Sequence, residues 1–171
     1  MSTPTLPSDY HRSAAFYASL ERDDDVGAVI RATGYVQDLL LELYLRNLER
    51  PALVDANRVS YSALIRLALT FGEITDELAK ALQLLAKIRN PLAHDLMSTI
   101  DSARVQNFFD ALPLMPFKSV SNALLAKPNM FPGMAPEARL LRVGLMQIVL
   151  ELVTCREHPL PRNRLPTQRV K

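Results

Sequence analysis

The spacing of apolar side chains is the feature that most constrains this chain, because they recur every three or four residues over long segments. That period places them on one face of an α-helix, whereas a half-buried strand would alternate at every second residue. The clearest segments cover about residues 26–48, 61–71, 75–88 and 136–158. The sequence shows no comparable alternating run and no internal repeat. It therefore predicts an all-α fold.

Residues that begin or end helices flank these segments. Asp23 to Asp25 give an acidic start to the first, and carboxylates suit the positive end of the helix dipole. Ser60 can cap the second and Gly72 can end it, while Pro136 suits the first turn of the last. Shorter helices are predicted at about residues 8–20, 101–112 and 119–127.

Length and composition favour one domain with flexible ends. The chain has 171 residues, enough for one well-formed core. We expect a single helical bundle of four or more main helices over residues 1–158. Residues 159–171 are rich in proline and arginine and poor in apolar surface, so we expect a disordered basic tail there.

The charge distribution argues against a broad DNA-binding face. The net charge is +2, and the tail alone carries four cations and no acid, so the rest of the chain is at −2. Residues 68–81 resemble a helix-turn-helix in spacing, but the second helix would begin with Asp76 and Glu77, which phosphates repel. We therefore expect no direct sequence-specific DNA binding.

Other functional classes are excluded more simply. The chain has one cysteine, and its three histidines lie far apart in sequence, so it carries no local metal motif. No apolar run approaches the length of a membrane span, and the N-terminus has no apolar signal core. The expectation is a cytoplasmic protein without a metal, a cofactor or a membrane partner.

The segment from Arg89 to His94 joins an arginine, an asparagine and the only mid-chain histidine around Pro91. A proline inside a helix lacks an amide hydrogen and crowds the carbonyl four residues earlier, here that of Lys87. We expect the helix to end there, with Asn90 capping a new turn that brings His94 towards Arg89.

Two roles for these side chains remain open from the residues alone. Arg89 can stabilise a helix C-terminus and His94 can be a structural or interface imidazole, in which case neither performs chemistry. Alternatively, the guanidinium and the imidazole meet in an accessible cleft and act on a phosphodiester.

The pattern Arg89-Asn90-x-x-x-His94 resembles the Arg-x4–6-His motif of HEPN-type helical domains, many of which are metal-independent ribonucleases. This resemblance implies acid–base chemistry by His94, phosphate stabilisation by Arg89 and orientation by Asn90. It also implies a site shared across a dimer, and a toxin or defence role with RNA as substrate. Many such toxins have a tyrosine two residues after the histidine, where this chain has Leu96.

Three segments together are similar to the mannitol operon repressor-like family of small helical bacterial regulators: Glu21–Asp23, Ser62–Gly72 and Leu84–His94. This resemblance implies a regulator without a conventional DNA-binding domain that works through protein–protein contacts. It also suggests that Glu21 or Asp23 pairs with Arg89 across the bundle. We therefore expect a transcriptional-repressor-like regulatory protein, as a homodimer with a regulatory protein partner; the alternative is an endoribonuclease using Arg89 and His94.

Overall fold

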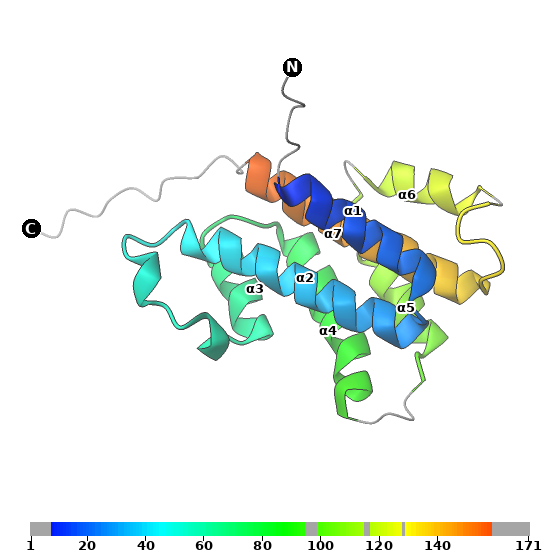
Figure 1. The fold of residues 1–171 in the computed structure, drawn as a ribbon, viewed down its shortest axis with the longest axis horizontal. Helices are drawn as coiled ribbons and strands as arrows, with labels where there is room; N and C mark the ends of the chain where they lie inside the picture. The colour runs from blue at the N-terminus through cyan, green and yellow to red at the C-terminus, as the bar shows by residue number, and fades with distance from the viewer. Residues whose placement is uncertain (1–7, 95–98, 115–116, 128, 159–171) are drawn as a thin grey trace, which may run out of the picture.

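The computed structural model describes residues 8–94, 99–114, 117–127 and 129–158, with the backbone alone at residues 8–14, 57, 93 and 94 (Figure 1). Every regular element in these ranges is a helix, which confirms the predicted all-α fold. The main helices are α1 (Ser8–Arg22), α2 (Asp25–Leu45), α3 (Tyr61–Thr70), α4 (Asp76–His94), α5 (Ser102–Asp110), α6 (Lys118–Leu125) and α7 (Pro136–Glu157). Two short 3-10 helices, Pro51–Leu53 and Ala56–Arg58, connect α2 to α3.

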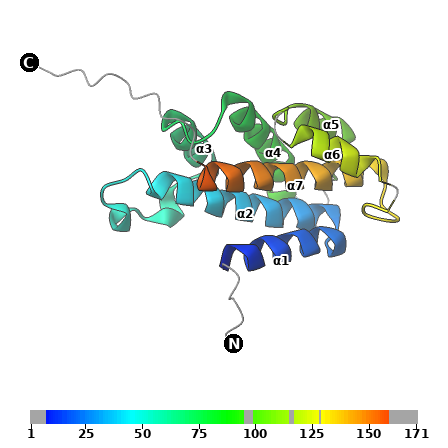
Figure 2. The same cartoon turned by 90° about the horizontal axis from the view of Figure 1, so that it is seen from above.

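The helices form layers around α2 and α7, which lie side by side (Figure 2). α1 covers the outer side of α2, while α5 and α6 pack on α7 from the opposite side. α3 and α4 form a helical hairpin against α2, and α4 also contacts α5. No helix in the described part of the chain is long and apolar enough to cross a membrane.

Local sequence signals set most of the helix starts. The Asp24 carboxylate accepts a hydrogen bond from the Gly27 amide at 2.6 Å, and the Ser60 hydroxyl accepts one from the Ala63 amide at 3.2 Å. Each satisfies an amide that has no partner within its own helix. α3 ends as predicted before Gly72, whose φ of +68° is a conformation that glycine adopts without strain.

α7 is buried on more sides than one apolar stripe would produce. Besides apolar residues such as Leu141, Leu145 and Ile148, the polar residues Arg142, Gln147 and Glu151 are buried. A helix at the centre of a bundle has neighbours on several sides, so polar positions also become enclosed. The sequence predicted the extent of α7 but not this central position.

Arg142 connects α7 to the junction between α1 and α2. Its side chain is 2% exposed, and its Nε and Nη2 atoms donate to the carbonyls of Leu20 and Asp23, each at 2.7 Å. Its Nη1 atom also donates to the carboxylate of Asp25. A buried guanidinium is tolerated when its donors are paired in this way. Arg142 thus links α7 to the junction where α1 ends and α2 begins.

Candidate functional site

The prediction that Pro91 breaks the helix was wrong, because α4 continues through it to His94. Asn90 therefore lies inside the helix and does not cap a new turn. The physical reason comes from α5. Pro91 cannot donate to the carbonyl of Lys87 four residues earlier, but the Arg104 Nη1 atom donates to that carbonyl at 3.2 Å. The group that the proline leaves unpaired is thus satisfied by another helix.

The continuous helix removes the corner that was expected to bring Arg89 and His94 together. Each residue turns an α-helix by about 100°, so positions five apart are separated by about 140° around its axis. The side chain of His94 lies outside the described residues. Its role in catalysis therefore stays a prediction, without the local geometry that motivated it.

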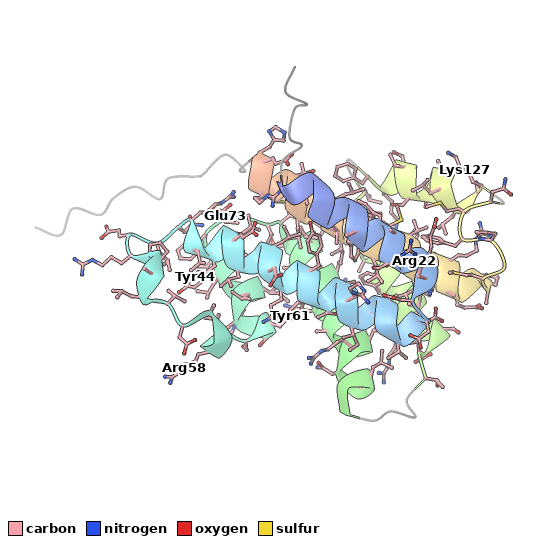
Figure 3. All side chains as sticks on the ribbon, viewed as in Figure 1. Arg22, Tyr44, Arg58, Tyr61, Glu73 and Lys127 are labelled. Carbon is pink, nitrogen blue, oxygen red and sulfur yellow. The ribbon has the colours of Figure 1, made fainter. Side chains whose placement is uncertain are left out.

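Arg89 lines a pocket of about 160 Å³ where α2, α3 and α4 meet. Tyr61 lies at the start of α3 (Figure 3), and its hydroxyl donates to the carbonyl of Leu82 on α4 at 3.4 Å. The described residues that line the pocket are Thr33 and Gln37 from α2, Tyr61 from α3, and Ala86, Arg89 and Asn90 from α4. We call it the Arg89 pocket.

The chemistry of the Arg89 pocket favours an anion. Among the described residues, the Arg89 guanidinium makes no hydrogen bond or ion pair, and no carboxylate lines the pocket. The hydroxyl of Thr33 donates to the carbonyl of Val29 at 2.7 Å, so it does not donate to a ligand in the pocket. The guanidinium of Arg89 and the amides of Gln37 and Asn90 therefore supply the main donors. Guanidinium and amide donors of this kind bind carboxylate or phosphate oxygens.

No described residue lining the Arg89 pocket is suited to be a general base at neutral pH. Among the described lining residues, Tyr61 is the only titratable group besides Arg89, and burial raises the pKa of Tyr61 well above its usual range. The phenol therefore stays neutral and cannot take a proton from a ribose hydroxyl. The described part of the pocket can bind an anion without activating a nucleophile.

A second hollow lies on the other side of Asn90, between α4 and α5, with a volume of about 430 Å³. We call it the α4–α5 groove. Its described lining residues are Leu84, Lys87, Asn90, Pro91, Arg104 and Asn107. Asn90 lines both hollows, so the last turns of α4 separate the groove from the Arg89 pocket.

The expected pairing of Glu21 or Asp23 with Arg89 is not found among the described contacts. The Asp23 carboxylate instead accepts a hydrogen bond from the Arg31 Nε atom at 2.7 Å. Glu21 is exposed at the end of α1. The carboxylates at the junction between α1 and α2 therefore accept hydrogen bonds from Arg31 and Arg142.

The site residues that the sequence did not predict come from other helices than α4. Thr33 and Gln37 lie one turn apart on α2, and Arg104 and Asn107 lie one turn apart on α5. Polar residues at such spacings are usual on any solvated helix face. Only the helix packing distinguishes them, so no local signal identified them beforehand.

The part of the chain with described side chains contains no group of three or more histidine, cysteine, aspartate or glutamate residues placed to hold a metal ion. Comparison with protein-family models, with curated proteins and with solved structures finds no match to this chain. The resemblances to mannitol operon repressor-like proteins and to HEPN-type domains therefore rest on the sequence segments alone.

Proposed function

We propose that this chain is a small helical regulatory protein that acts through protein–protein contacts made at the end of α4. The observation that carries the proposal is the Arg89 pocket, which offers anion-binding donors and no described general base. The continuous course of α4 also supports it, since nothing in the helix brings Arg89 and residue 94 to one turn. The function is then recognition, with Arg89 as a binding residue.

Direct DNA reading is not part of this proposal. The α3–α4 hairpin has the expected turn at Gly72, but α4 begins with Asp76 and Glu77, both of them exposed. Carboxylates at the start of a helix would repel phosphates and would not suit the major groove. A regulator of this kind acts on another protein, and we expect it to work as a homodimer in the cytoplasm.

Recovery of partners from the organism that carries the gene tests the proposal. The tagged full-length chain, its Arg89→Glu variant and an Arg66→Glu control would be compared by quantitative affinity purification. Arg66 is an exposed arginine of α3 that does not line the pocket, so the control changes net charge equally. We expect at least one protein to be recovered with wild type and with the Arg66→Glu control, but not with the Arg89→Glu variant. Recovery of no specific protein would contradict it.

A second candidate function is a metal-independent endoribonuclease of the HEPN type. It is favoured by one observation, the Arg89 guanidinium, which has no partner among the described residues and lies beside Asn90 in the pocket. In this case wild type cleaves RNA in EDTA, while Arg89→Gln and His94→Ala do not. Arg66→Gln should cleave normally, and melting curves show whether each variant remains folded. Absence of cleavage by wild type would eliminate this candidate.

A further inference from the structure

The α4–α5 groove has a cationic rim. Lys87 is exposed on α4, and Arg104 faces it from α5 with half of its side chain exposed. No aspartate or glutamate is among the described residues that line the groove. An exposed patch of one sign, with no opposite charge inside it, attracts ligands of the other sign.

Arg104 is held in place without being neutralised. Its Nη1 atom donates to the carbonyl of Lys87 at 3.2 Å, and its Nε atom lies 3.6 Å from the Asp101 carboxylate. Both members of the Arg104–Asp101 pair are about half exposed, so water screens their attraction. The guanidinium is therefore oriented at the rim while retaining donors for a ligand. Such preorganisation lowers the entropy lost on binding.

The rest of the groove suits a peptide. Leu84 and Pro91 are half-buried and provide an apolar surface, while the exposed amides of Asn90 and Asn107 can each donate and accept hydrogen bonds. A peptide backbone presents the same two kinds of group, an N–H donor and a C=O acceptor. The combination fits an extended segment with an apolar side chain between acidic ones.

RNA fits the groove less well. Proteins that bind single-stranded nucleic acid commonly stack bases on aromatic rings, and no aromatic residue is among the described residues lining the groove. Two cations are also few for a phosphate backbone, and the first 158 residues carry a net charge of −2.

We propose that the α4–α5 groove binds an acidic peptide segment of the partner protein, with carboxylates at Lys87 and Arg104 and an apolar side chain against Leu84 and Pro91. This inference rests on the proposed regulatory function and names the surface and the chemistry of the partner.

The test uses fluorescence anisotropy of the full-length chain with a short labelled peptide that is rich in glutamate and has one central leucine. Wild type should bind it, and added salt should weaken the binding. Lys87→Glu and Arg104→Glu should each weaken it about tenfold or more, and Arg66→Glu should leave it within about twofold. The same peptide with glutamines should not bind. Equal binding by wild type and the Lys87→Glu variant, no binding by wild type, or tighter binding of a short single-stranded RNA would overturn the proposal.

Photo-crosslinking in cells distinguishes an error in the groove proposal from an error in the proposed regulatory function. A crosslinking amino acid would replace Asn107 in the groove, Gln37 in the Arg89 pocket or, as a control, Arg66 on α3, which lines neither hollow. A protein captured from Gln37 but not from Asn107 would overturn the groove proposal and leave the regulatory function standing. No specific capture from either Asn107 or Gln37 would contradict both proposals, whatever is captured from the Arg66 control.

Discussion

The link between Pro91 and Arg104 makes a quantitative prediction, because one residue removes a hydrogen bond and the other replaces it. In wild type, the Lys87 carbonyl accepts from Arg104 instead of from the amide of residue 91. Pro91→Ala restores an amide at that position, so the carbonyl then has a partner within its own helix. The two substitutions should therefore be strongly coupled.

The magnitude follows from the exposure of the contact. A hydrogen bond from a charged donor contributes about 1.5–3 kcal/mol when well buried, and the half-exposed Arg104 side chain lowers this to about 1 kcal/mol. Arg104→Ala should therefore destabilise wild type by about 1 kcal/mol. In the Pro91→Ala background, Arg104→Ala should lower the free energy of unfolding by about 0.3 kcal/mol or less, since only the weak pair with Asp101 is lost.

Urea denaturation followed by circular dichroism measures all four proteins of this double-mutant cycle. The predicted coupling energy between positions 91 and 104 is about 0.7–1 kcal/mol. Lys87 contributes only its carbonyl, so Lys87→Ala should leave the coupling unchanged and serves as a control. Equal costs of Arg104→Ala in both backgrounds would show that Arg104 does not compensate for the proline.

Three further predictions concern Glu151 and Gly144 on α7 and Gly34 on α2. Burial raises the pKa of Glu151 from an ordinary 4.5 to about 7, so the folded state binds this proton more tightly than the unfolded state does. The free energy of unfolding should therefore fall as the pH rises from about 5 to 7 and then level off. Glu151→Gln should abolish this slope and raise the free energy of unfolding at pH 8 by about 1–3 kcal/mol in chemical denaturation; an unchanged slope would show that Glu151 is not its source. Gly144→Ala should destabilise by about 1–3 kcal/mol, because its Cβ would lie 2.7 Å from Cε1 of buried Phe108. Gly34→Ala on α2 has open space and should stabilise by about 0.5–1 kcal/mol; similar melting temperatures for both alanine variants would refute the packing argument.

The sequence predicted the helices well where their limits depend on neighbouring residues. Ser60 and Gly72 act within one turn of the helix they cap or end, so the pattern of residues is sufficient. The same local reasoning gave a wrong prediction at Pro91, because the Lys87 carbonyl that the proline leaves unpaired accepts a hydrogen bond from Arg104 on α5. The partner of a backbone group outside its own helix depends on packing, which local spacing does not encode.

The candidate site was predicted only in part for the same reason. Arg89 and Asn90 line the pocket that the structure shows, but Gln37 and Tyr61 come from two other helices. Arg142 was not singled out from the sequence either, and its burial depends on contacts with Leu20 at the end of α1 and Asp25 at the start of α2. The tail at residues 159–171 lies outside the described residues, and its disorder stays a prediction.

The central claim is that α4 is one helix through Pro91. Its end then presents binding groups, and no break at Pro91 brings His94 towards Arg89. The Cα chemical shifts of residues 88–94 in isotope-labelled protein test this most directly in solution. We predict helical shifts from Ile88 through His94, with no extended residue at Asn90. An extended shift at Asn90, followed by a new helical turn from Pro91, would contradict the claim and restore the geometry expected of a ribonuclease.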